Sequence, residues 1–218
     1  MQIEILSLSS AGEDEIFVSV ELREGEKCEK KRLLVPSSVY VDMRLRKGEC
    51  TPEAFDALEY ESNVYAAYKR GVYIVGFGAC SERMLISKLI AKGFEKNIAR
   101  TAVGRIAEHG FISEKDNAVR EAERAFAKLW GASRIRAHLI SRGYSSDTVN
   151  CALFALEDSG FDFGENCRRL IESKYKKIPK DRNELQKLIA SVCRYGYSLG
   201  EVRSACAEIA SRKNSIYD

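Results

Sequence analysis

The apolar residues of this chain follow a repeating pattern, and the pattern predicts its architecture. Residues 93–111 begin and end with a glycine followed by an aromatic residue, and residues 143–161 repeat that arrangement at the same length. Apolar residues around the first glycine have apolar counterparts 50 positions later. A looser third copy surrounds Gly196. A period of this size, with one supersecondary unit per copy, is typical of helical repeat proteins.

Each copy is expected to contain three helices. Gly93, Gly143 and Gly196 would end the middle helix of each copy in the left-handed conformation that glycine adopts easily. The predicted fold is therefore mainly α, with three tandem three-helix repeats in an elongated, curved array and a small antiparallel β module at the N-terminus. The predicted bounds are 1–48 for the β module, 51–111, 112–161 and 162–212 for the repeats, and 213–218 for a tail.

The N-terminal module has the period of strands. Residues 2–8 and 16–22 alternate apolar and polar positions, a turn follows at 24–27, and a returning strand ends at Pro36. This predicts an antiparallel sheet of about three strands, followed by a short helix that Ser37 could cap. Three strands need a covering element for stability, so we expect the sheet to dock on the helices.

Helical periodicity begins at Thr51, whose hydroxyl would cap a helix with proline at its first turn. Ser62 and Asn63 could divide that helix into two. Residues 71–78 are compatible with a strand or with a helix end. A strand would place a G-x-G before a helix, but Ser81 stands where a dinucleotide-binding loop has its third glycine. A helix end is therefore the favoured interpretation, with Ser81 and Ser113 as caps of later helices.

Composition fits an ordinary folded protein. The 218 residues are 45% hydrophobic and 31% charged, and the net charge of +3 is too small to indicate nucleic-acid binding by itself. Lys and Arg outnumber Asp and Glu in residues 162–218, whereas the two signs balance in 112–161. No apolar run is long enough to cross a membrane, and the polar N-terminus is not a signal peptide. A cytoplasmic protein is expected.

Catalytic and metal-binding motifs are missing from the sequence. The seven cysteines contain no C-x-x-C pair, and Cys193 and Cys206 fall at core positions of the third repeat. The two histidines, His109 and His138, are isolated and expected on solvated faces. No nucleophile motif or phosphate-binding loop accompanies them. We therefore expect a protein that is not an enzyme and that holds no cofactor or metal.

Basic side chains recur at corresponding positions of the repeats, which a repeat array would align along one face. Arg134, His138 and Arg142 are four residues apart and so share one side of their helix, and Lys88 and Lys92 match the last two. For any single residue an ordinary solvated face is the alternative. Reversing these charges is expected to change stability little. The candidate partner-binding residues are Arg83, Lys88, Lys92, Arg134, His138, Arg142, Arg168, Arg169, Lys174, Lys176 and Lys177.

A set of short motifs between Thr51 and Ala210 has a familiar order and spacing. They are Ser81-Glu82 with Leu85, Leu89 and Lys92-Gly93-Phe94; Gly110-Phe111-Ile112 with Glu114 and Ala118; Gly131 with Arg134-Ile135, Leu139 and Arg142-Gly143-Tyr144; and Arg194-Tyr195-Gly196-Tyr197. In these motifs the chain resembles the RecX family, the regulators of the RecA recombinase.

The resemblance implies a non-enzymatic modulator that binds RecA filaments on single-stranded DNA, and we expect it to act as a monomer. Such proteins block filament extension, strand exchange and the coupled ATP hydrolysis. The alternative is a protein that binds DNA directly through helix-turn-helix-like units with basic helices. The two functions differ in whether naked DNA is sufficient or a recombinase filament is required.

Overall fold

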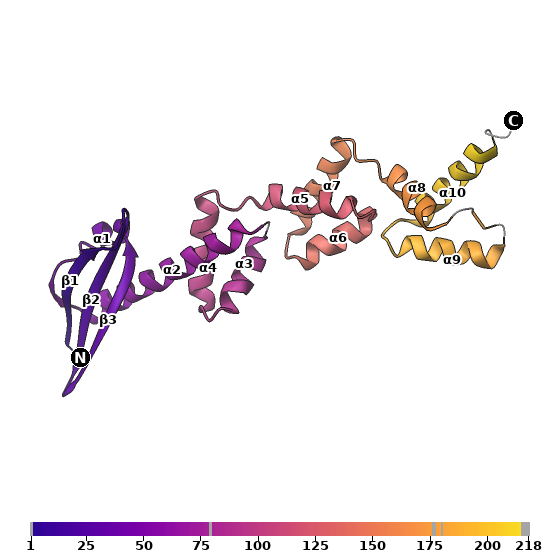
Figure 1. Cartoon of the computed structure of the whole chain (residues 1–218). Helices are drawn as coiled ribbons and strands as arrows, with labels where there is room; N and C mark the ends of the chain where they lie inside the picture. The colour runs from indigo at the N-terminus through magenta and orange to yellow at the C-terminus, as the bar shows by residue number, and fades with distance from the viewer. Residues whose placement is uncertain (1, 79, 176–177, 180, 215–218) are drawn as a thin grey trace. The chain divides into compact units, whose positions relative to one another are not determined.

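The computed structural model describes residues 2–78, 80–175, 178–179 and 181–214. Within these residues the fold is mainly helical, with ten helices and one four-stranded sheet (Figure 1). Two compact units are present. The first contains the described residues of 1–78 and 85–111, and the second those of 79–84 and 112–214. None of the described helices combines the length and the apolar character that a membrane crossing needs.

The sheet is antiparallel, and its strands lie in the order β3-β2-β1-β4. Three strands lie where they were predicted, the first two of them from their alternation, whereas the fourth was not predicted. Its three residues are too few to show a period, and the strand exists because it pairs with the edge of β1, where Ile3 lies opposite Cys50. The strands are β1 (Gln2–Ser10), β2 (Glu15–Glu24), β3 (Lys27–Pro36) and β4 (Gly48–Cys50).

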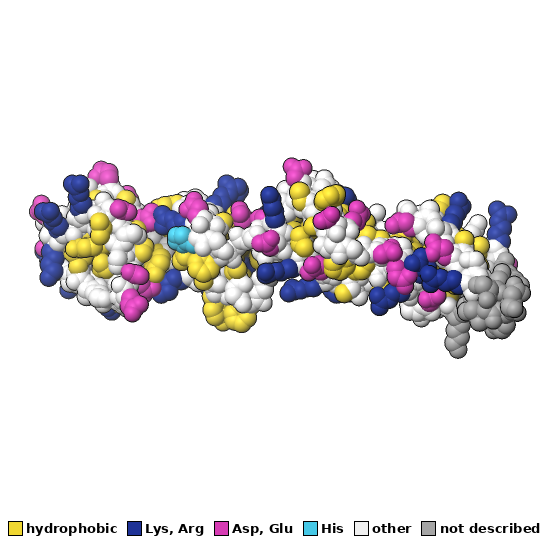
Figure 2. All heavy atoms as spheres, turned by 90° about the horizontal axis from the view of Figure 1, so that it is seen from above, with side chains coloured by type: hydrophobic (Ala, Val, Ile, Leu, Met, Phe, Trp, Pro, Cys, Tyr) yellow, Lys and Arg dark blue, Asp and Glu magenta, His cyan; other side chains and the backbone are white. Residues whose placement is uncertain are grey.

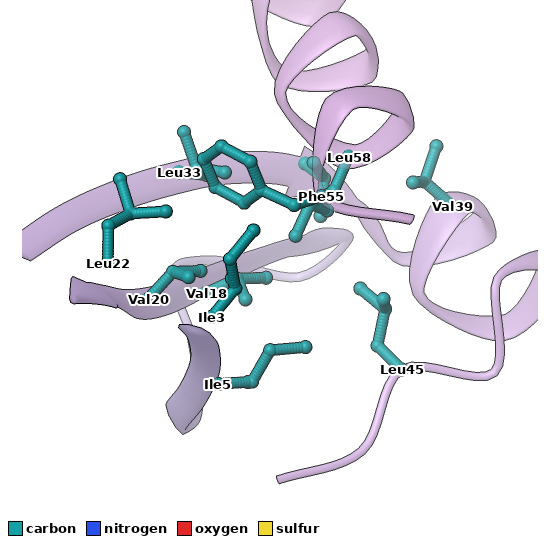
Figure 3. Close-up of a cluster of buried hydrophobic side chains, with 11 residues drawn as sticks. Ile3, Ile5, Val18, Val20, Leu22, Leu33, Val39, Leu45, Phe55 and Leu58 are labelled. Carbon is teal, nitrogen blue, oxygen red and sulfur yellow. The ribbon is translucent and has the colours of Figure 1, made fainter. Parts of the chain in front are cut away.

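One face of the sheet is covered by helices, as expected for a sheet of this size. The inward side chains of β1, β2 and β3 meet Phe55 and Leu58 of helix α2 (Pro52–Gly76), and Leu58 is fully buried (Figure 3). Val39 of helix α1 (Ser37–Asp42) closes the same core. Pro36, not Ser37, is the N-cap of α1, and no side chain caps that helix.

Helix α2 begins as predicted and continues without a break. The Thr51 hydroxyl accepts a hydrogen bond from Ala54 N at 3.3 Å. Ser62 does not interrupt the helix, because its hydroxyl points away from the helix backbone and accepts a hydrogen bond from Leu34 N of β3 at 3.2 Å. The ambiguous segment 71–78 is a helix end, as favoured from the sequence. Gly71 is needed for close packing, because a Cβ there would lie 2.4 Å from Ile106 Cδ1.

The first unit is completed by helices from the next part of the chain. Ser81 caps α3 (Glu82–Ile90), accepting from Met84 N at 3.1 Å. Helix α4 (Lys96–Glu108) packs on α2 through a core that contains Val64, Ala67, Ile98 and Ala102.

In the described part of the second unit, six helices follow one another and pack around the apolar cores that the structure shows there. Ser113 caps a helix as predicted, and Ser145 and Ser198 cap further helices at the same spacing of three residues. The basic run from Arg168 predicts a helix that begins there, but helix α8 begins earlier, at Phe163 behind an Asp162 cap. Cys193 and Cys206 are half-buried against the second core, consistent with their predicted packing role. The helices are α5 (Glu114–Phe126), α6 (Ala132–Ser141), α7 (Ser146–Asp158), α8 (Phe163–Lys174), α9 (Arg182–Cys193) and α10 (Leu199–Asn214).

Gly93, Gly143 and Gly196 all have the predicted positive φ, at 95°, 93° and 95°. Two of them also make close contacts in the second unit. Gly143 lies against Ser81, whose hydroxyl donates to Arg142 O at 2.6 Å, and Gly196 lies against Gly131. The shared conformation fits the repeat interpretation. The number of copies, their bounds and their arrangement as an array stay predictions.

Alanine variants of two glycines in the second unit would separate the stability cost of backbone strain from that of steric crowding. Gly196 and Gly160 both have positive φ, but a Cβ at Gly196 would lie 2.4 Å from Arg134 N, whereas Gly160 faces open space. Left-handed strain should cost each alanine variant about 1 kcal/mol. Crowding should add about 1–3 kcal/mol to Gly196→Ala alone. Urea unfolding followed by fluorescence of the single tryptophan checks this difference, and equal midpoints for the two variants would contradict it.

Candidate functional site

A close backbone contact in the second unit creates the candidate site. Gly131, the N-cap of α6, donates from its N–H to Tyr195 O at 2.8 Å, and Ser133 N donates to Gly196 O at 3.2 Å. A Cβ at Gly131 would lie 2.4 Å from Gly196 O, so the two backbones could not approach this closely with larger residues. The contact brings together the side chains that precede the two glycines, Trp130 and Tyr195.

Three basic side chains lie over these two rings. Arg134 Cζ is 4.1 Å from the Trp130 ring centroid and 5.2 Å from that of Tyr195. Lys128 Nζ is 5.5 Å from the Trp130 centroid, and Lys174 Nζ is 4.0 Å from the Tyr195 centroid. These distances are typical of cation–π interactions. We call Lys128, Trp130, Arg134, Lys174 and Tyr195 the cation–aromatic cluster.

The cations of the cluster keep their charge uncompensated by acids. Among the residues that the structure describes, neither Lys128, Arg134 nor Lys174 forms an ion pair with Asp or Glu. Lys128 and Lys174 are exposed, while the two rings and Arg134 are half-buried. A fixed ring orients each cation without neutralising it. The cluster can therefore attract phosphates or carboxylates of a partner.

A buried carboxylate of α5 contacts the basic side chains that follow Arg134 along α6. Glu121 of α5 has a side chain that is only 7% exposed. Its carboxylate accepts hydrogen bonds from Arg142 Nε at 3.2 Å and from the Tyr144 hydroxyl at 3.3 Å. His138 lies between this carboxylate and the cluster, with Nε2 3.7 Å from Glu121 and its ring edge-on to Trp130. Arg142 thus compensates a buried acid of its own chain.

Arg134, His138 and Arg142 do share one side of α6, as their spacing predicts, but they are half-buried rather than fully solvated. For His138 the expected solvated face is wrong, because the ring packs on Trp130. The small stability change expected on charge reversal assumed exposed charges, and Arg142 does not meet that assumption, because it is half-buried and paired with Glu121. Its removal would leave Glu121 buried without its strongest partner.

The protonation of Arg142 follows from its carboxylate partner, and that of His138 from its burial. The hydrogen bond with Glu121 raises the pKa of Arg142, against the smaller opposing effect of burial. Burial lowers the pKa of His138 below its ordinary value of 6.5, and the neighbouring cations Arg142, Lys128 and Arg134 act in the same direction, while Glu121 opposes it. Arg142 is thus a fixed charge, whereas His138 is held towards its neutral form.

The other predicted residues have separate surroundings. Arg168 pairs with Glu165 and with Glu208, which joins α8 to α10 and gives it a structural role. Lys88 and Lys92 are exposed on the first unit, and Arg83 and Arg169 on the second. The grouping of Lys88 and Lys92 with the residues of α6 stays a prediction. Lys176 and Lys177 lie outside the described residues.

The sequence did not nominate four residues of this region: Lys128, Trp130, Tyr195 and Glu121. Trp130 is the single tryptophan and directly precedes a glycine, which could have marked it. The repeat register hid Tyr195, because it occupies the position of the cations Lys92 and Arg142. Figure 2 shows basic and acidic side chains interspersed on the face that it presents, so charge alone would not single out the cluster.

The Glu121–Arg142 pair should contribute to stability. Arg142→Ala leaves the carboxylate buried with weaker partners, so we expect the free energy of unfolding to fall by about 2 kcal/mol. Arg136→Ala, at an exposed position of the same helix, is the control and should stay within about 0.5 kcal/mol of the parent. Urea unfolding followed by circular dichroism measures both. Equal effects of the two variants would show that the pair is not a structural one.

His138 should make the second unit sensitive to acid. Its pKa is lowered by folding, so the unfolded chain binds the proton more readily. The stability that neutral His138 contributes is full above pH 6.5 and is lost as the pH falls through the lower folded pKa. We expect His138→Gln to lose less stability than the parent between about pH 7 and about pH 5. Urea midpoints across this range test the expectation, and identical pH slopes for parent and variant would refute it.

The chain was compared with protein families, with curated proteins and with solved structures. No protein-family model matches the chain. The Regulatory protein RecX of Xanthomonas axonopodis pv. citri (strain 306) is 29% identical over 126 residues, which cover 57% of this chain and 76% of the relative. The Regulatory protein RecX of Stenotrophomonas maltophilia (strain R551-3) is 26% identical over the same shares of the two chains.

Solved structures share the fold at lower identity. A crystal structure of regulatory protein RecX has a TM-score of 0.72 and 17% identity, and the match covers 93% of this chain and 99% of that one. A crystal structure of RecX from Lactobacillus salivarius has a TM-score of 0.60 and 16% identity, covering 68% and 97%. These comparisons confirm the resemblance carried by the sequence motifs: the chain is similar in sequence to curated proteins named Regulatory protein RecX and similar in fold to crystal structures of RecX.

Proposed function

We propose that this chain is a non-enzymatic regulator of the RecA recombinase that acts on RecA filaments assembled on single-stranded DNA in the cytoplasm. The observation that carries the proposal is the likeness to RecX regulatory proteins, which extends from sequence over 57% of the chain to fold over 93%. The finer mechanism is part of the proposal. Binding would modulate, and mostly inhibit, filament extension, strand exchange and ATP hydrolysis, and the regulator would act as a monomer.

The cation–aromatic cluster supplies the binding chemistry for this function. A nucleoprotein filament presents phosphates and acidic side chains, and each attracts cations that no acid among the described residues neutralises. Holding Arg134 and Lys174 against rings reduces the side-chain freedom that binding would otherwise remove. Both residues belong to the set that the sequence nominated. We therefore place the main contact of the filament on this cluster.

The remaining nominated residues divide into two proposed roles. Arg83, Lys88, Lys92 and Arg169 are exposed and would extend the contact with the filament. Arg142 and Arg168, with His138, would act indirectly, because each is held by partners within the second unit. They would fix the helices that carry the cluster.

Direct binding of DNA is the second candidate function, and the same cluster favours it. Cations suit the backbone of a nucleic acid, which carries one phosphate per nucleotide, and aromatic rings suit its bases. Both functions predict association that weakens with salt. The two differ in their requirement, because a filament regulator needs the recombinase whereas a DNA-binding protein needs only the DNA.

The exposed lysines of the cluster allow a test that leaves the core intact. We expect Lys128→Gln/Lys174→Gln to need about tenfold more protein to inhibit ATP hydrolysis by the host recombinase on single-stranded DNA. The matched control is Lys115→Gln/Lys187→Gln, which removes two exposed lysines of the same unit outside the cluster and should inhibit like the parent.

Circular dichroism verifies the fold of both variants, and naked single-stranded DNA is titrated in parallel. Equal inhibition by cluster and control variants would exclude the cluster as the contact. Tight binding of naked DNA by a parent that leaves the recombinase unaffected would replace the proposed function by direct DNA binding.

A further inference from the structure

The first unit contains a cavity that the proposed function does not use. Its volume is about 640 Å³, within the range of about 300–1,000 Å³ that is common for ligand sites. Asp14 and the end of α1 form one side, and helices α2 and α4 form the other. All of these elements belong to one compact unit, so the cavity is part of its packing.

The lining of the cavity is acidic. Of the residues that the structure describes, four carboxylates line it, those of Asp14, Asp42, Glu61 and Glu108, against one side chain with a fixed positive charge, Arg105. Arg105 is already paired, because its guanidinium donates hydrogen bonds to both carboxylate oxygens of Glu61 at 2.8 and 2.9 Å. The other three carboxylates are exposed, and within the described residues they form no ion pair. The cavity therefore has an excess of three negative charges.

Two tyrosines give the cavity a fixed aromatic wall. The rings of Tyr65 and Tyr68 are nearly parallel, at 12° and 6.2 Å between centroids. The Tyr65 hydroxyl donates to Glu15 at 2.7 Å, and the Tyr68 hydroxyl is 2.9 Å from His109 Nδ1. Both rings are thus held in place without a ligand, which lowers the entropic cost of binding one.

The aromatic surface continues outside the cavity. Phe111 does not line the cavity, but its ring lies edge-on to Tyr68 at 6.5 Å and is 49% exposed. A ligand that contacted both the cavity and Phe111 would need a charged part next to an apolar part. A small inorganic cation cannot satisfy both. An extended chain with basic and apolar side chains can.

We propose that this cavity binds an Arg or Lys side chain of a basic protein segment, and that an apolar neighbour in that segment packs on Phe111. Carboxylates and aromatic faces are the two groups that bind guanidinium and ammonium ions best in proteins. Nucleic acid is excluded as the occupant, because the three unpaired carboxylates would repel its phosphates. The site goes beyond the proposed function, since its charge is opposite to that of the cation–aromatic cluster.

The first test uses a fluorescein-labelled peptide with alternating Arg and Leu and follows its anisotropy at physiological salt. Asp42→Asn/Glu108→Gln removes two of the unpaired carboxylates and should weaken binding by about fivefold or more. The matched control, Glu24→Gln/Glu26→Gln, removes two exposed acids of the same unit outside the cavity and should change binding by less than about twofold. Absence of binding by the parent, or equal loss in both variants, would overturn the proposal.

The second test concerns Phe111. We expect Phe111→Ala to weaken the Arg-Leu peptide but not a peptide with Gly in place of Leu, whereas Phe77→Ala, which removes an exposed ring of the same unit, should change neither. Spermidine serves as a competitor of comparable charge without apolar side chains. If spermidine displaced the peptide at equal concentration, the ligand would be a free polyamine and not a protein segment. If Phe111→Ala bound both peptides like the parent, the apolar contact would be excluded, which would also overturn the proposal of a protein segment.

Discussion

The backbone contact between Gly131 and Gly196 is the constraint on which the second unit depends. A side chain on either glycine would overlap backbone atoms of the other segment, so the contact requires both residues to lack a Cβ. The hydrogen bonds from Gly131 N and Ser133 N then fix the two segments against each other. Because Trp130 and Tyr195 directly precede these glycines, the same contact sets the spacing of their rings. Arg134 can reach both rings only for this reason.

Basic residues that look equivalent in the sequence have different physical roles. Arg142 and Arg168 face carboxylates of their own unit, and their charge is used to hold helices together. Lys128 and Lys174 face aromatic rings and solvent, which leaves their charge available to a partner. In the first unit the situation is reversed, because carboxylates around the cavity exceed the single arginine. The proposed filament contact and the proposed peptide site therefore differ in sign, and one partner surface would not satisfy both.

Local signals explain which elements could be predicted. Caps at Thr51, Ser113 and Ser198 act between residues three apart, so their effect is visible in the sequence. Alternation in β1 and β2 likewise reports the buried face of the sheet. Strand β4 could not be found this way, since its three residues are stabilised by pairing with β1. The Asp162 cap that begins α8 is also a local signal, but the basic run from Arg168 suggested a later start for this helix.

The sequence by itself determined the mainly helical fold, the N-terminal sheet, the left-handed glycines and the family resemblance, because each rests on local preference or on a recurring pattern. It also nominated Arg134 and Lys174. Only the tertiary structure decided which cations are compensated by acids of other helices, in addition to the local pair of Arg168 with Glu165. Glu121 precedes Arg142 by 21 positions, and Glu208 follows Arg168 by 40. The contact of Arg134 with Tyr195 and the acidic cavity were undetermined for the same reason: both are formed by residues distant in sequence that packing brings together.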